Sequence, residues 1–216
     1  QNLHVIFAID RAGLVGSDGE THQGCFDLSY LSMIPNMTVL APKNKWELSD
    51  MLKFAVRYQG PIAIRYPRGE AYDGLEEYRE PMVYGKSELI FEGEETALLS
   101  VGSMVETAVE VREKLKADKI NATLVNARFI KPLDTKILDR LALKHKKIVT
   151  MEENVKNGGF GMAVSEYMQE YHPEVKVQII ALPDAFITHG NPKLLKAKAG
   201  IDADSIYGAI KEAEKR

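Results

Sequence analysis

Short apolar runs rich in β-branched residues alternate with longer amphipathic stretches, and this alternation most constrains the fold. In the second half of the chain, strands are predicted at 96–102, 121–127, 146–153 and 175–182, and helices at 103–117, 134–145, 160–171, 191–200 and 202–215. Alternating β and α units are typical of a mostly parallel sheet with helices on both faces. The sequence therefore predicts an α/β protein whose second half is a complete, doubly wound domain.

The first part of the chain carries too few elements for a domain of its own. Strands are predicted at 4–10, 37–42 and 61–67, and they lack polar alternation, so burial on both faces is expected. A parallel sheet needs helices on both faces, but only one clear helix is predicted here, within 44–59. We therefore expect the missing half of this domain to lie upstream of Gln1.

The predicted helix within 44–59 has an apolar face and a start signal. Asn44 is a plausible N-cap, and Glu47 stands three residues later as its capping-box partner. The apolar face is predicted to comprise Leu48, Met51, Leu52 and Ala55.

A polar stretch punctuated by Pro and Gly, residues 69–87, separates the two parts. We expect the domain boundary between residues 70 and 95. The predicted division is residues 1–84 and residues 85–216.

Composition excludes several function classes. A net charge of −3 and a pI near 6.0 give no reason to expect nucleic acid or an anionic membrane as a partner. No apolar run approaches the roughly 20 residues that span a bilayer. The single Cys25 has no internal partner, so a reducing, cytoplasmic compartment is the expectation.

Arginines follow two of the predicted strands of the first part. Arg11 comes directly after the first strand, and Arg65, Tyr66 and Arg68 follow the run 61–64. Ligands of parallel α/β sheets bind at the carboxyl ends of the strands, and Arg suits phosphate or carboxylate. The pattern predicts an anion site at this edge, although salt bridges to nearby acids would account for the same arginines.

The glycine-rich stretch 10–24 adds an acid and a histidine, Asp18 and His22. A carboxylate near a histidine can fix the tautomer of the ring and raise its basicity, so the pair is a candidate for proton transfer. The alternative is a solvated surface loop with an Asp-Gly turn. Close approach of the backbone to a small ligand would be possible at Gly13, Gly16, Gly19 and Gly24.

Other signals are interpreted structurally. The segment 157–161, Asn-Gly-Gly-Phe-Gly, lacks the spacing of phosphate-binding loops and is predicted to be a helix-start turn. The acids in 152–154 have no metal-ligand partners at recognisable spacing, so a solvated strand end is expected. Cys25 is predicted to be small buried filler. No role is assigned to His4, His145, His172 and His189.

The string "AIDRAGLVGSDGETHQGCFDLSYL", together with "RYPRG", "ARFIKPLD", "TMEENVKNGGFG" and "LPDAFITHG", resembles the 1-deoxy-D-xylulose-5-phosphate synthase family. These are thiamine-diphosphate enzymes of the transketolase superfamily. The resemblance spans essentially all 216 residues. It implies part of a transketolase-type pyrimidine domain followed by the whole C-terminal domain, as the last third of such an enzyme.

The resemblance also implies an activity and site residues. Such enzymes condense pyruvate with D-glyceraldehyde 3-phosphate and release CO2, as homodimers with thiamine diphosphate and Mg²⁺. Arg11 and Arg68 match arginines that bind the acceptor phosphate, and Asp18 and His22 match residues that contact substrate hydroxyls and help move protons. Arg65 and Tyr66 are expected to support them.

The family's metal and cofactor motifs, and its catalytic glutamate, lie upstream of Gln1 in this comparison. The chain alone is therefore expected to bind no cofactor or metal and to be inactive. Two alternatives stay open: a non-catalytic split subunit or partner domain, and a β-type subunit of another thiamine-dependent 2-oxoacid enzyme.

Overall fold

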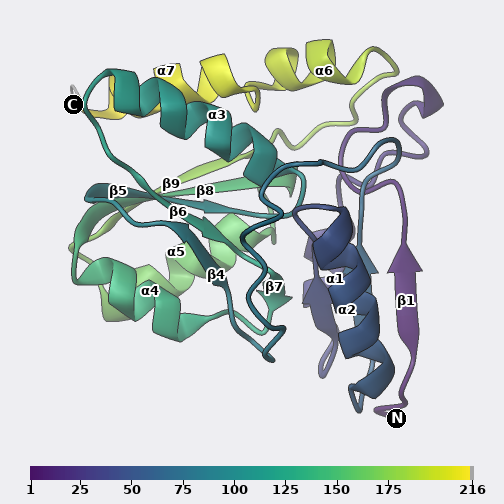
Figure 1. Cartoon of the computed structure of the whole chain (residues 1–216). Helices are drawn as coiled ribbons and strands as arrows, with labels where there is room; N and C mark the ends of the chain where they lie inside the picture. The colour runs from purple at the N-terminus through teal and green to yellow at the C-terminus, as the bar shows by residue number, and fades with distance from the viewer. Residues whose placement is uncertain (215–216) are drawn as a thin grey trace.

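The computed structural model describes residues 1–214 and arranges them around two β-sheets (Figure 1). The first sheet has the strand order β1-β3-β2-β7, and the second has the order β4-β6-β5-β8-β9. The strands of the first sheet are β1 (Ile6–Ile9), β2 (Thr38–Leu40), β3 (Ile62–Arg65) and β7 (Phe129–Lys131). Those of the second are β4 (Glu88–Phe91), β5 (Glu95–Ser100), β6 (Thr123–Asn126), β8 (His145–Val155) and β9 (Lys176–Leu182).

Helices cover both faces of the second sheet, which confirms the doubly wound α/β prediction (Figure 1). One face carries α3 (Met104–Ala117), α6 (Pro192–Ala199) and α7 (Ala203–Glu214), and the other carries α4 (Thr135–Ala142) and α5 (Phe160–Tyr171). The first part contributes α2 (Lys45–Arg57), the short α1 (Asp27–Ser32) and one 3₁₀ turn, η1 (Gly16–Asp18). Among residues 1–214, no helix combines the length and the apolar character that crossing a membrane requires.

Two strands escaped the sequence analysis, β4 and β7. Both pair antiparallel, β4 with β6 and β7 with β2, in otherwise parallel sheets. β7 comes from the second half of the chain yet joins the first sheet, where Phe129 packs in a core with Leu40 and Ile62. Both lie at the edge of a sheet, and the packing decides which strand each pairs with. The division of the chain at residues 84 and 85 stays a prediction.

The expectation of burial on both faces is right for β2 and β3 but wrong for the first strand. Every residue of β2 and β3 is buried, whereas Phe7 in β1 is 41% exposed. β1 ends the order of the first sheet and pairs with β3 on one side. β7 ends the same sheet at the other edge but its Phe129 and Ile130 pack in buried cores, whereas Phe7 belongs to no core cluster of the described residues.

Helix α2 begins as predicted. The Asn44 side chain accepts a hydrogen bond from the Glu47 backbone N–H at 2.9 Å. The Glu47 carboxylate does not close the expected capping box, because it accepts instead from the Lys43 N–H at 2.7 Å. Met51 and Ala55 are fully buried, but Leu52 is exposed, so its assignment to the apolar face is wrong.

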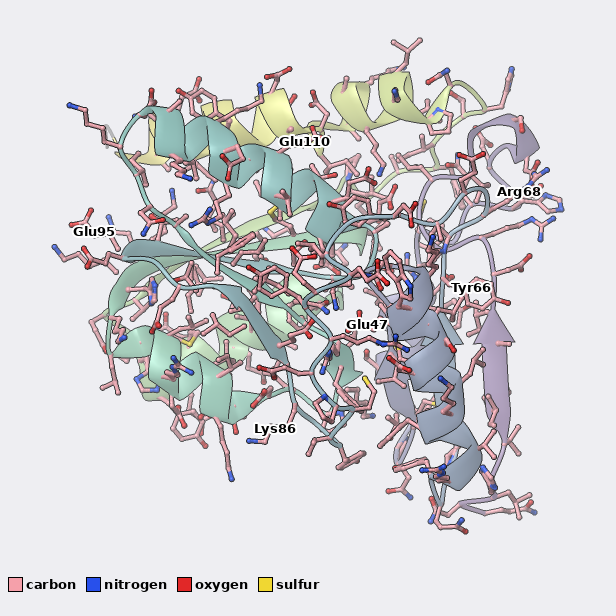
Figure 2. The ribbon with its side chains drawn as sticks, in the orientation of Figure 1. Glu47, Tyr66, Arg68, Lys86, Glu95 and Glu110 are labelled. Carbon is pink, nitrogen blue, oxygen red and sulfur yellow. The ribbon has the colours of Figure 1, made fainter. Side chains whose placement is uncertain are left out.

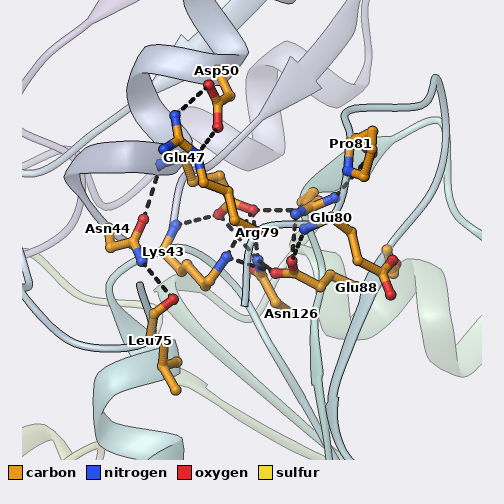
Figure 3. Close-up of polar contacts among 12 residues, drawn as sticks. Lys43, Asn44, Glu47, Asp50, Leu75, Arg79, Glu80, Pro81, Glu88 and Asn126 are labelled. Atoms are coloured by element: carbon orange, nitrogen blue, oxygen red, sulfur yellow. Dashed lines mark hydrogen bonds and ion pairs between the residues drawn. The ribbon is translucent and has the colours of Figure 1, made fainter. Parts of the chain in front are cut away.

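The Glu47 carboxylate belongs to a buried ionic cluster between the two parts of the chain (Figure 3). Arg128 donates to Glu47 and to Glu88, each at 2.6 Å, and Lys43 donates to Glu88 at 2.6 Å. Asn126 completes the cluster by donating to Glu47 at 2.9 Å. The cluster therefore pairs two buried cations with two buried carboxylates, and these pairs connect α2 to β4 and to the end of β6.

Candidate functional site

The glycine-rich stretch 10–24, here called the site loop, emerges from the carboxyl end of β1 (Figure 1). The Ala12 N–H donates to the Tyr66 carbonyl at 3.0 Å, which ties the loop to the segment after β3. The loop also closes on itself, because the Gly24 N–H donates to the Arg11 carbonyl at 2.9 Å. The loop and the segment after β3 therefore meet at one edge of the sheet, as the sequence predicted.

Arg11 and Arg68 converge on the carboxylate of Asp18. The Arg11 Nε donates to Asp18 at 3.1 Å, and the Arg68 Nη1 donates to the other carboxylate oxygen. The two guanidinium groups, Arg68 first, hold the pKa of Asp18 below its usual value. The Arg68 side chain is 50% exposed, so it remains accessible to a ligand, and Figure 2 shows it at the end of the first sheet. The salt bridges that were the alternative to an anion site are thus present, and they use the two arginines assigned to that site.

His22 is exposed and has a different partner from the one the sequence suggested. Its Nδ1 lies 2.9 Å from the Thr21 hydroxyl, and its backbone N–H donates to the Gly19 carbonyl at 3.1 Å. Both oxygens of Asp18 are occupied by arginines. The structure brings Asp18 and His22 into one loop but does not join them by a hydrogen bond.

Arg65 is buried and points into the protein. Its Nε donates to Asp27 at 3.1 Å, and its Nη2 donates to the carbonyls of Gly24 at 2.6 Å and Glu153 at 2.8 Å. Arg65 therefore holds the end of the site loop against β8. Tyr66 contributes its backbone, which accepts from Ala12 and donates to the Ile9 carbonyl.

The site-loop glycines approach their own chain. A Cβ at Gly13 would lie 2.6 Å from the Glu153 carboxyl carbon, and a Cβ at Gly16 would lie 2.6 Å from the Gly190 carbonyl oxygen. The expectation that Gly13 and Gly16 make room for a ligand is therefore corrected: they make room for β8 and for the segment after β9.

The prediction of a solvated strand end at 152–154 is wrong. Glu152, Glu153 and Asn154 are all buried at the end of β8. The Glu152 carboxylate accepts hydrogen bonds from the N–H groups of Phe160 at 2.9 Å and Gly161 at 2.8 Å, so it caps α5. Burial raises the pKa of Glu152 to about 7. The packing of α5 and of the site loop against this strand end decides the burial, and no local pattern indicates it.

Two structural interpretations are confirmed. The segment 157–161 is the turn that starts α5, with Gly159 at the N-cap. Cys25 is buried, and burial raises the pKa of its thiol to about 12, which makes it a poor nucleophile.

The remaining histidines are accounted for in the fold. His145 is buried against the Thr123 hydroxyl at 2.7 Å, His4 lies 3.1 Å from the Ala55 carbonyl, and His172 pairs with Asp139. His189 lies beside Gly19 of the site loop.

The described residues do not fit a metal-diphosphate group. Within residues 1–214, no three His, Cys, Asp or Glu side chains are grouped so that they could hold a metal ion. The acids beside the two arginines are already paired with them, Asp18 with Arg11 and Arg68, and Asp10 with Arg11. No chemical step is therefore derived through a cofactor held by these residues.

Sequence reasoning missed the contacts that hold the site loop against the second half of the chain. Gln23 donates to the Thr188 carbonyl at 3.3 Å, and the Leu14 N–H donates to Glu153 at 3.4 Å. The one available signal was the position of Glu153, directly at the carboxyl end of a predicted parallel strand.

Comparison with known proteins agrees with this fold. Residues 85–206 match the transketolase C-terminal domain, and residues 1–73 match the transketolase pyrimidine binding domain. A solved structure described as a split gene transketolase, inactive beta4 tetramer, has a TM-score of 0.89 and 29% identity, and the match covers 98% of this chain and 67% of that one. The transketolase of Campylobacter jejuni has the same fold, with a TM-score of 0.73 at 21% identity over 96% of this chain and 31% of that one.

Two curated relatives are the same kind of enzyme within this family. The 1-deoxy-D-xylulose-5-phosphate synthase of Lachnoclostridium phytofermentans is 56% identical over 209 residues, which are 96% of this chain and 33% of the relative. That of Desulforudis audaxviator is 46% identical over 218 residues, covering 100% of this chain and 34% of the relative. The chain spans about a third of the length of these relatives. It therefore belongs to the transketolase family, and within that family it is a homologue of the 1-deoxy-D-xylulose-5-phosphate synthases.

Proposed function

We propose that the chain is part of a thiamine-diphosphate-dependent synthase that condenses pyruvate with D-glyceraldehyde 3-phosphate to 1-deoxy-D-xylulose 5-phosphate and CO2. The observation that carries the proposal is the convergence of Arg11 and Arg68 on the two carboxylate oxygens of Asp18. Arg11 also pairs with Asp10, so two partly exposed guanidinium groups face two carboxylates that an incoming anion would have to displace. The two guanidinium groups suit the phosphate of the acceptor.

In this proposal Arg11 and Arg68 bind the phosphate, while Asp18 keeps the two guanidinium groups oriented before the acceptor arrives. Once phosphate takes over the arginines, the Asp18 carboxylate becomes free to contact a substrate hydroxyl. His22, exposed in the same loop, is proposed to help move protons during the reaction.

Thiamine diphosphate and a divalent metal are proposed for the complete enzyme, held by protein outside residues 1–214 of this chain. When bound, the cofactor supplies the carbanion chemistry of the reaction. A cytoplasmic homodimer is the accompanying expectation from the resemblance.

The test uses the complete synthase with Arg68→Ala or Arg11→Ala. The value of kcat/KM for D-glyceraldehyde 3-phosphate should fall by roughly 10- to 1000-fold, because a charge-assisted contact to phosphate is lost. The KM for pyruvate should change little. Arg79→Ala is the matched control, since Arg79 is a partly exposed arginine paired with Asp50, away from the site loop.

Unphosphorylated D-glyceraldehyde provides the decisive comparison. Equal losses for the phosphorylated and the unphosphorylated aldehyde would show that these arginines do not recognise the phosphate.

A second candidate is a subunit of a split enzyme, in which another chain supplies the cofactor site. It is supported by the similarity, at a TM-score of 0.89, to the split gene transketolase. The coding region upstream of Gln1 separates the two candidates. An open reading frame that continues into a cofactor-binding motif favours one long synthase, and a start codon close to Gln1 favours a split subunit.

A further inference from the structure

We infer that Glu153 is a positioning residue for the site loop, and through it for acceptor binding. This inference rests on the proposed function for its catalytic consequence. The hydrogen bonds and the ion pair of the Glu153 side chain join it to Leu14, Ser103 and Lys196, and not to Asp18 or His22. Its effect is proposed to act through the backbone of the loop that carries them.

The Glu153 carboxylate joins three separate segments. It accepts from the Leu14 N–H of the site loop at 3.4 Å and from the Ser103 hydroxyl, just before α3, at 2.6 Å. The ammonium group of Lys196, on α6, lies 3.3 Å from the same carboxylate. Glu153 is almost fully buried, so these partners are not replaced by water.

The site loop is shaped to receive this carboxylate. Gly13 has a left-handed φ of +72°, and a Cβ there would lie 2.6 Å from the Glu153 carboxyl carbon. The loop backbone therefore rests directly on the Glu153 side chain. A buried carboxylate that accepts from several donors is held in one orientation, so Glu153 forms a rigid support for the site loop.

The neighbours of Glu153 hold the far end of the same loop. The Val155 N–H donates to the Cys25 carbonyl at 2.8 Å, and Arg65 bridges the carbonyls of Gly24 and Glu153. Of these residues, Glu153 is the one that contacts the first part of the site loop, at Gly13 and Leu14, which precede Asp18 and His22 in sequence. Removing its charge should loosen that part and leave the far end attached.

The experiment compares Glu153→Gln with Glu152→Gln in the complete synthase. Glu152 is an ideal control because it is the adjacent buried carboxylate, but it caps α5 and has no contact with the site loop among its hydrogen bonds. Ser103→Ala is a milder second variant, which removes one partner of Glu153 if Glu153→Gln fails to fold.

The first readout is amide hydrogen exchange, which does not depend on activity. Glu153→Gln should raise exchange in peptides covering 10–24, and Glu152→Gln should raise it in peptides covering 160–171. The second readout is steady-state kinetics. Glu153→Gln should lower kcat/KM for D-glyceraldehyde 3-phosphate about 10- to 100-fold, since small displacements of binding groups are costly, with little change in the KM for pyruvate.

Unchanged exchange in residues 10–24 of both Glu153→Gln and Ser103→Ala would overturn the inference. So would faster exchange without any change in the acceptor kinetics. If Arg68→Ala shows no phosphate selectivity, the proposed function fails by itself, and the exchange result still decides whether Glu153 holds the loop.

Discussion

Arg128 and Glu47 form an ion pair at 2.6 Å with both side chains only 2% exposed. Arg128 lies between β6 and β7, and Glu47 lies in the first turn of α2, so the pair joins the two parts of the chain. Arg128 also pairs with Glu88, and Lys43 pairs with both glutamates, so two cations neutralise the two buried carboxylates. The junction is therefore held by this charge network together with shared apolar cores, in which Val39 packs with Leu99 and Leu40 packs with Phe129.

Arg128→Met should destabilise the chain strongly. The methionine fills part of the volume but leaves buried carboxylates with one cation fewer, and breaking such a pair typically costs about 3–5 kcal/mol. The measurement is the urea midpoint followed by fluorescence or circular dichroism. Asp50→Asn is the matched control, because the pair of Asp50 with Arg79 is solvent-exposed and should contribute about 0–1 kcal/mol. Similar losses in the two variants would contradict the prediction.

The Glu152 carboxyl should make stability fall as pH rises. Its pKa is raised by burial from 4.5 to about 7 in the folded chain, so between these values the unfolded chain has lost the proton that the folded chain keeps. The free energy of unfolding therefore falls by up to about 3 kcal/mol as the pH rises from 4.5 to above 7. Glu152→Gln removes this titration.

The difference between the two stability profiles isolates Glu152, since the other groups titrate in both proteins. Wild type should lose stability relative to Glu152→Gln across this window in urea melts at pH 4.5, 6 and 8. Parallel profiles would mean that the two backbone hydrogen bonds and the start of α5 keep the pKa of Glu152 near its ordinary value.

Gly13→Ala should be more costly than the same change at Gly200. The two glycines have nearly equal φ values, +72° and +73°, so the strain on an alanine backbone is similar, about 1–2 kcal/mol. Only Gly13 also faces Glu153, whereas nothing in the described part of the chain lies within 4 Å of a Cβ at Gly200. Thermal or urea melts should therefore show an extra loss of about 1–3 kcal/mol for Gly13→Ala. Equal losses would show that the site loop can move away from Glu153.

The purified chain by itself should bind no thiamine diphosphate at micromolar concentration and should not decarboxylate pyruvate. A diphosphate needs a metal or cations to neutralise it, and residues 1–214 group no three side chains suited to a metal. The exposed residues of β1, including Phe7, should favour self-association instead. Calorimetric titration with thiamine diphosphate and magnesium, with light scattering for association, provides the test. Micromolar binding, or any decarboxylation of pyruvate, would contradict the prediction and favour a self-sufficient enzyme.

The sequence by itself determined the order of most helices and strands, because the pattern of apolar residues that predicts each element lies within that element. It also placed the arginines: Arg11 and Arg68 each follow a parallel strand, and the carboxyl ends of such strands meet at one edge whatever the details of packing. The Asn44 cap was equally readable, since donor and acceptor are three residues apart.

Tertiary structure decided what depends on partners distant in sequence. Glu152 and Glu153 are polar residues at a strand end, and only the packing of α5, α6 and the site loop around them makes them buried and fully engaged. Asp18 pairs with Arg68, which is 50 residues away in sequence, because the fold brings both residues to the same edge of the first sheet. Burial and charge pairing are properties of the assembled neighbourhood, and a local pattern of residues does not carry them.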